Sequence, residues 1–345
     1  MEEEITLLPV REFPDRGTKW LLETPENVEC LLRIISVSLA DCIDFSRLRD
    51  LKTTFIPDNL RKQESDLVFL APFVEQKQGS EQEVMIYILI EHQSKPSWEM
   101  GFRMLFYMTQ IWDRQRRAWV AEDVPETQWR FRPILPVLFY TGKANWKAPL
   151  SVTALMDLPE ELEAFVPQHR TLFLNLKNAE PEKLVAEGHP FGWVLRVIQK
   201  EYAKKEGFVE ALRLAVSHLD KLSEEEKNQW EKLMYYLVLL ILHRRDEEEQ
   251  PEFISLVNET VKDYNRREEV AKMGRTAAQA LMEEGEIRGV LRARREDLLK
   301  FIRGKFQSVP TFVEQKILTI RDVNKLSVLI DNVISANSID EISIE

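Results

Sequence analysis

The pattern of apolar and polar positions centres on residues 84–90, seven consecutive apolar residues that run directly into Glu91, His92 and Gln93. Periodicity alone is compatible with a helix, but the polar segments on both sides favour a short strand buried on both faces. Because side chains alternate along a strand, Glu91 and Gln93 should leave it on one side and His92 on the other.

Other short apolar runs predict further strands, at residues 51–57, 66–74, 134–140 and 172–176. The loop containing Gly79 should join 66–74 to the central run as a hairpin. A helical pattern over residues 98–118 separates the central run from the next strand and can cross one face of the sheet. The pattern therefore predicts an α/β fold.

The helix predicted at 98–118 carries two stripes of side chains. One is apolar and is expected to face the core: Phe102, Leu105, Met108, Ile111 and Trp112. The other recurs at intervals of three and four residues: Arg103, Tyr107, Gln110, Arg114 and Arg117. Such spacing places its members together along the helix. By itself the second stripe is best interpreted as a solvated polar face, and the alternative is a phosphate-binding surface.

Helical patterns dominate both ends of the chain. One covers about residues 18–40, with a break expected at Pro25, and another pattern continues from about residue 180. Ser223 and Glu226 have the spacing of a capping box. A charged helix is expected over 270–303 with interruptions at two glycines, followed by two short helices around Asp322.

Composition excludes several classes of protein. The 345 residues carry a net charge of −11, which argues against general coating of nucleic acid or anionic membranes but permits a local basic groove. The two cysteines have no metal-ligand spacing. The N-terminus has no apolar signal core, and the longest apolar run is too short to span a bilayer. These features predict a cytoplasmic protein.

Carboxylate chemistry is the main catalytic option, since phosphate loops, nucleophile elbows and zinc-protease motifs are absent from the sequence. Asp66 opens one predicted strand and Glu91 closes its neighbour, so an antiparallel hairpin would make the two carboxylates neighbours. Oxygen ligands of this kind suit Mg²⁺ or Mn²⁺, and the backbone carbonyl of His92 could be a third ligand. Gln93 could orient a water. The alternative is an ordinary polar strand end.

Three stretches carry a family resemblance: Arg61-x-x-x-x-Asp66-Leu67-Val68, Leu89-Ile90-Glu91-His92-Gln93-Ser94, and Phe102-Arg103-x-Leu105-x-Tyr107-Met108. Together they resemble the recombination-promoting nuclease, or YhgA-like putative transposase, family of the PD-(D/E)xK nuclease superfamily. The resemblance covers most of the chain and is strongest over 61–142.

This resemblance implies a restriction-endonuclease-like core, a mixed sheet flanked by helices, followed by a helical C-terminal region. The expected domains are a nuclease-like domain at 1–178, a helical region at 179–268 and a charged helical extension at 269–345.

The same resemblance implies roles for individual residues. Asp66 and Glu91 would bind Mg²⁺ or Mn²⁺ and act in catalysis. Gln93 stands where the wider superfamily has a lysine. Arg103 and Tyr107 would have supporting or phosphate-binding roles. The polar pair Asp15 and Lys19 matches the first helix of the family.

The function implied is that of a metal-dependent DNA endonuclease with a role in recombination or transposon movement. The alternative is a catalytically weak or inactive nuclease-fold protein that acts as an interaction or regulatory module, which the acidic charge and Gln93 favour. DNA is the expected partner, a membrane is not, and assembly into a homo-oligomer is left open.

Overall fold

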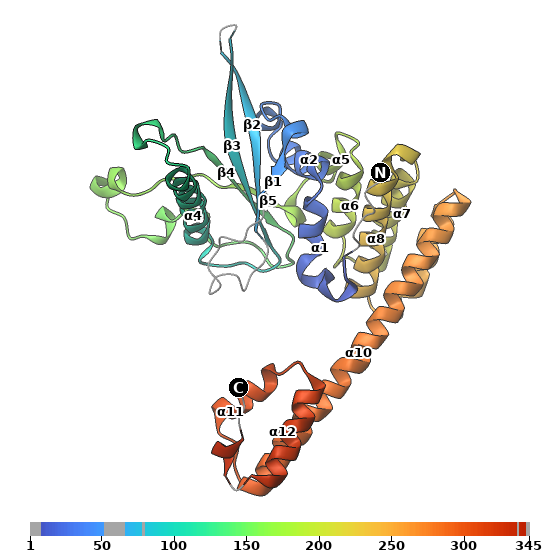
Figure 1. Ribbon diagram of the computed structural model, residues 1–345. Helices are drawn as coiled ribbons and strands as arrows, with labels where there is room; N and C mark the ends of the chain where they lie inside the picture. The colour runs from blue at the N-terminus through green and yellow to red at the C-terminus, as the bar shows by residue number, and fades with distance from the viewer. Residues whose placement is uncertain (1–7, 52–65, 78–79, 337, 343–345) are drawn as a thin grey trace. The chain divides into compact units, whose positions relative to one another are not determined.

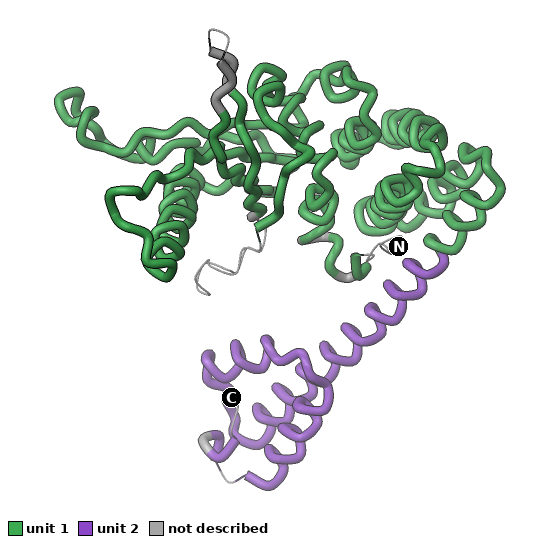
Figure 2. Tube along the Cα trace, turned by 45° about the horizontal axis from the view of Figure 1, so that its top comes forward, with its two compact units in different colours: residues 1–274 green, residues 275–345 purple. Residues whose placement is uncertain are grey.

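The computed structural model describes residues 8–51, 66–77, 80–336 and 338–342. These residues divide into two compact units, 1–274 and 275–345 (Figure 2). The first unit contains the sheet and the helices that precede and follow it. A boundary near residue 178 within that unit stays a prediction.

A five-stranded mixed sheet forms the centre of the first unit (Figure 1). Its strands lie in chain order: β1 Arg49–Asp50, β2 Asp66–Lys77, β3 Ser80–Gln93, β4 Ile134–Tyr140 and β5 Leu172–Asn175. The first three are antiparallel, whereas β3, β4 and β5 are parallel. The central apolar run is thus the buried strand that was predicted. Most of the strand expected at 51–57 falls outside the described residues, and Leu51 itself is not in a strand.

Helix α4, Met100–Ala121, covers one face of the sheet and connects β3 to the parallel strand β4 (Figure 1). Its buried residues Met104, Tyr107 and Ile111 share a core cluster with Leu89 of β3. The expected apolar face was wrong in part, because Phe102 is 54% exposed whereas Tyr107 is buried. The helix is rotated so that the buried side chains of β3 meet Met104 and Tyr107.

The helices drawn on the other side of the sheet in Figure 1 include α1 Phe13–Leu22, α2 Pro25–Ile35, α6 Pro190–Gln199 and α8 Lys227–Arg244. They are accompanied by α3 Val37–Ala40, α5 Pro181–Val185, α7 Lys205–Leu219 and α9 Gln250–Thr260. Phe13 packs on Tyr236 and His243 and so joins α1 to α8. Pro25 begins α2 after the predicted break, and the predicted capping box precedes α8.

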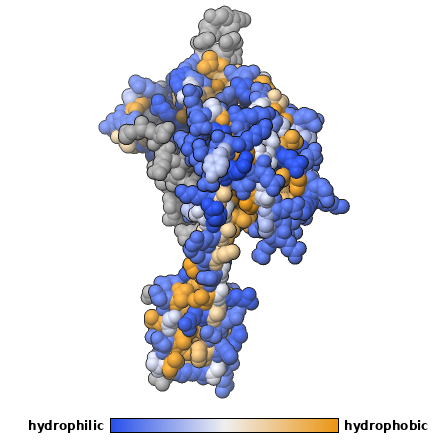
Figure 3. All heavy atoms as spheres, turned by 90° about the vertical axis from the view of Figure 1, so that its right-hand side faces the viewer, coloured by the Kyte–Doolittle hydropathy of each residue, from blue (hydrophilic) through white to orange (hydrophobic). Residues whose placement is uncertain are grey.

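The second unit contains the end of α10, Tyr264–Phe306, with α11, Thr311–Thr319, and α12, Val323–Ser335. A separate core includes Leu298, Ile317 and Leu329. Asp322 caps α12 by accepting from two backbone N–H groups, which confirms the two short helices around it. Apolar side chains also reach the surface of this unit (Figure 3), among them Phe312. No described helix is both long and apolar enough to cross a membrane.

Helix α10 continues through Gly285 and Gly289, so the expected interruptions were wrong. A Cβ at either position would meet no atom within 4 Å. Replacing both with alanine should therefore stabilise the helix by about 1 kcal/mol per site, since glycine loses more backbone entropy on folding.

Calorimetry of the double variant should show a transition at higher temperature. Gly101→Ala is the matched control, because its Cβ would lie 2.3 Å from the Ser151 carbonyl oxygen and should destabilise the first unit. A lower transition for the double variant would contradict an open helical environment at 285 and 289.

Candidate functional site

The edge of the sheet where β3 ends brings two acidic positions together. Asp66, the first residue of β2, is the cross-strand partner of Glu91 in the antiparallel register. Partners in such a register lie close enough for their side chains to interact. The predicted hairpin and its pairing of positions 66 and 91 are therefore confirmed. The structure describes the backbone of Asp66 but not its side chain.

Glu91 is fully buried. Its Oε1 accepts from Gln93 Nε2 at 2.5 Å and from Arg103 Nη2 at 2.7 Å. Its Oε2 is buried with no hydrogen-bond partner among the described residues. A buried carboxylate oxygen normally has a partner, so Oε2 is an available ligand atom. The bond to Gln93 confirms that Glu91 and Gln93 leave β3 on the same side.

Arg103 provides the positive charge beside Glu91. It is 8% exposed, and its Nε and Nη2 lie 3.2 and 2.9 Å from the Tyr107 hydroxyl oxygen. Positions 103 and 107 are one helical turn apart, so both side chains face the sheet. The polar stripe predicted along this helix is therefore not one surface. Its first two members are buried at the site, whereas Arg114 and Arg117 are exposed.

The backbone carbonyl of His92 points toward β2. On the β4 side, Tyr87 N–H donates to the Pro133 carbonyl and the Gln93 carbonyl accepts from Thr141 N–H. Backbone groups alternate in direction along a strand, so the odd-numbered residues of β3 bond to β4. The carbonyl of the even-numbered His92 is consequently directed to the side of the strand that begins at Asp66.

The chemistry of these groups fits a hard divalent cation. Glu91 Oε2, which has no partner in the described part of the chain, a second acidic position across the strand and a backbone carbonyl are oxygen donors of the kind that Mg²⁺ and Mn²⁺ prefer. Within the described residues, no cluster of three or more His, Cys, Asp or Glu side chains could hold a metal. A cation here would therefore retain several waters, as Mg²⁺ usually does.

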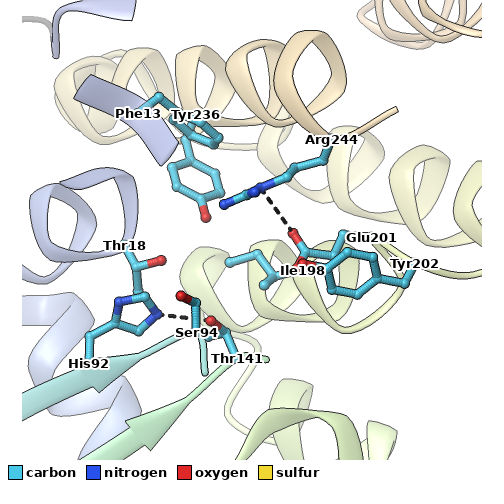
Figure 4. Close-up of a pocket in the computed structure, with 10 residues that line it drawn as sticks. All are labelled: Phe13, Thr18, His92, Ser94, Thr141, Ile198, Glu201, Tyr202, Tyr236 and Arg244. Atoms are coloured by element: carbon cyan, nitrogen blue, oxygen red, sulfur yellow. Dashed lines mark hydrogen bonds and ion pairs between the residues drawn. The ribbon is translucent and has the colours of Figure 1, made fainter. Parts of the chain in front are cut away.

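The side chain of His92 enters a separate polar cavity on the opposite face of the sheet (Figure 4). Its Nε2 lies 2.9 Å from the Thr141 hydroxyl oxygen, a hydrogen bond between the ends of β3 and β4. Burial, reinforced by the positive charge of Arg244, lowers the pKa of His92 to about 4. Burial also raises the pKa of Glu201, whose carboxylate lies 3.9 Å from Arg244. Sequence reasoning missed this cavity, because its lining comes from distant segments without a common motif.

The polar pair of the first helix is not assigned to the site. Asp15 and Lys19 lie on α1, and the side chain of Asp15 is outside the described part of the chain. Phe13 and Thr18 of the same helix line the cavity on the His92 face. A contribution of Asp15 and Lys19 to the chemistry at Glu91 stays a prediction.

Loss of the buried positive charge should be costly. Arg103→Met would leave the buried Glu91 carboxylate without its positively charged partner, and breaking a buried ion pair in this way destabilises a protein by about 3–5 kcal/mol. Adding Glu91→Gln should recover part of that loss. Urea unfolding of both variants measures the effect.

Arg117→Met is the matched control, because Arg117 is exposed and its ion pair with Asp113 lies at the surface, where such pairs contribute little to stability. Equal losses for Arg103→Met and Arg117→Met would show that the Glu91 pair is not a buried constraint.

His92 should make stability depend on pH. The unfolded histidine binds a proton near its ordinary pKa of 6.5, whereas the folded one does so only at about 4. As pH falls through this window, folding should lose on the order of 2–3 kcal/mol through this group. His92→Gln should flatten the decline in urea unfolding, whereas Thr141→Val, which keeps the imidazole, should not. Parallel pH profiles for wild type and His92→Gln would contradict the assignment.

Comparisons with known proteins identify the family. A family model described as "Putative transposase, YhgA-like" matches residues 14–230, more than half of the chain, including all five strands. Recombination-promoting nuclease RpnC of Escherichia coli strain K12 is 30% identical over 139 residues, 40% of this chain and 41% of that protein. The match thus spans less than half of the relative's length, and no solved structure matches the chain. On the strength of the family model, the chain belongs to the YhgA-like putative transposase family.

Proposed function

We propose that this chain is a metal-dependent DNA endonuclease that hydrolyses phosphodiester bonds. The observation that carries the proposal is the buried Glu91 carboxylate, whose Oε2 has no hydrogen-bond partner among the described residues and whose cross-strand neighbour is Asp66. The name of the relative, a recombination-promoting nuclease, supports the same chemistry. In this proposal Asp66, Glu91 and the His92 carbonyl hold Mg²⁺ or Mn²⁺.

The residues of the chain would then divide the work. When bound, the cation would act as a Lewis acid and would lower the pKa of a coordinated water. Arg103 fixes one oxygen of Glu91 and leaves Oε2 available. Tyr107 holds the guanidinium in place. The Gln93 amide, bonded to Glu91 through its nitrogen, keeps a carbonyl oxygen that can accept from the attacking water.

One observation favours a second candidate, a nuclease fold that serves as an interaction or regulatory module. Gln93 stands in the place of a lysine and brings no positive charge, and the charge of Arg103 is already paired with Glu91. A developing negative charge on phosphate would then be stabilised less. The net charge of −11 is compatible with partners other than DNA.

Metal binding and plasmid cleavage, measured together, separate the endonuclease from the regulatory module. Mn²⁺ should raise the melting temperature of the wild type, because a ligand at one hundred times its Kd stabilises by about 2.7 kcal/mol. Asp66→Asn and Glu91→Gln should respond far less and should not cleave plasmid DNA. Without metal, Asp66→Asn should be more stable by about 1 kcal/mol, since it removes a charge across from Glu91.

Asp331→Asn, an exposed change in the second unit, is the matched control and should behave as wild type. If wild type and Asp66→Asn respond identically to Mn²⁺, Asp66 is not a ligand and the endonuclease proposal fails. A metal response without cleavage would favour the regulatory candidate.

A further inference from the structure

A groove of about 240 Å³ opens between the second half of α4 and the sheet. Its floor is formed by Val68, Leu70 and Tyr87, and its wall includes Ala118 and Trp119 of α4. The volume is just below the roughly 300–1,000 Å³ of most small-molecule sites. The groove therefore suits a single flat ring system, with Tyr87 on its floor and Trp119 on its wall.

The groove lies on the same face of the sheet as Glu91. Leu70 pairs with Tyr87, and Asp66 pairs with Glu91, so the two cross-strand pairs are four residues apart on β2 and β3. At about 3.3 Å per residue, the groove floor begins at Val68, about 7 Å along β2 from Asp66, and the Leu70–Tyr87 pair lies about 13 Å from the two acidic positions. A nucleic-acid strand with a phosphate at Glu91 can reach this groove with a base a short way along the same strand.

The aromatic wall is held rigidly. The Trp119 ring stacks on Trp129 with centroids 5.5 Å apart and contacts Phe131 at 5.2 Å. Gln115 anchors the segment that carries these partners, because it donates to the Arg130 carbonyl and accepts from the Arg132 N–H. These contacts hold the Trp119 ring in place. A ligand that packs against the ring therefore does not incur the entropy loss of ordering a free side chain.

Positive charge borders the groove in an otherwise acidic protein. Arg114 and Arg132 line it together with one carboxylate, Glu122. Arg132 donates to the Tyr87 hydroxyl at 3.3 Å, and its guanidinium lies 5.7 Å from the centre of that ring. Guanidinium groups beside aromatic faces are the arrangement by which proteins bind single strands, with arginine at the backbone and an aromatic ring under the base.

We propose that this groove binds an unpaired base of single-stranded DNA whose backbone continues to Glu91. The proposal rests on the proposed endonuclease function and specifies its substrate class, DNA with a single-stranded segment. A paired base is enclosed in its stack and cannot enter the groove unless it is extruded, which costs a few kcal/mol. Duplex DNA is therefore the weaker ligand of this surface.

Filling the groove tests the proposal. Ala118→Trp adds bulk at the solvent-open wall, and Val120→Trp adds the same bulk at an exposed position of α4 that does not line the groove. Fluorescence anisotropy would measure binding of a labelled oligothymidylate and of a hairpin duplex to the full chain, without divalent metal. Arg132→Gln serves as a second variant, and circular dichroism confirms that each variant is folded.

Ala118→Trp should weaken binding of the oligothymidylate at least about fivefold, the lower end of the effect of losing one stacked base. Binding of the duplex to Ala118→Trp, and of both ligands to Val120→Trp, should match wild type. Arg132→Gln should also weaken binding of the single strand.

Unchanged single-strand binding by Ala118→Trp, equal loss for the duplex, or no binding of the oligothymidylate by wild type would overturn the proposal. Metal-dependent plasmid cleavage is measured separately. Absence of cleavage with a groove-dependent single-strand affinity would refute the endonuclease and leave the groove intact. Normal cleavage together with unchanged single-strand binding by Ala118→Trp would refute the groove proposal and leave the endonuclease proposal intact.

Discussion

The buried Glu91 carboxylate is the constraint on which this end of the sheet depends. A charge removed from water is tolerated only with a compensating partner, and here Arg103 of α4 provides it at 2.7 Å. The pair requires α4 to face β3 with positions 103 and 107 inward, and this rotation also places Met104 and Ile111 in the core. The same rotation of α4 therefore fixes both the packing of this crossover helix and the geometry of the candidate site.

Alternation along β3 divides the strand end between two environments. Glu91 and Gln93 face α4, where one oxygen of Glu91 has no hydrogen-bond partner within the residues that the structure describes. His92 faces the helical side, where its bond to Thr141 joins the ends of two parallel strands. Its backbone carbonyl lies between these environments and points to β2. Three consecutive residues therefore contribute a buried carboxylate, a structural hydrogen bond and a polar amide at the end of one strand.

The chain belongs to the YhgA-like putative transposase family, and one relative is named a recombination-promoting nuclease. Net charge runs against general attraction to DNA. Contact with a phosphate backbone would therefore have to be local, at positions where arginines gather. The α4 face of the sheet contains such arginines both at Glu91 and along the groove beside Trp119.

By itself the sequence determined the strands at 84–90 and 134–140, the break at Pro25, the two short helices around Asp322 and the pairing of Asp66 with Glu91, because apolar runs, turn residues and hairpin register are local signals. Only the tertiary structure decided that Arg103 is buried, that Phe102 faces solvent and that α10 continues through its glycines. The first two outcomes depend on the rotation of a helix against a sheet and on a buried charge that needs a partner. Helical spacing in the sequence specifies neither the rotation of the helix nor the partner of the buried charge. It also cannot reveal a cavity such as the one around His92, whose lining comes from distant segments.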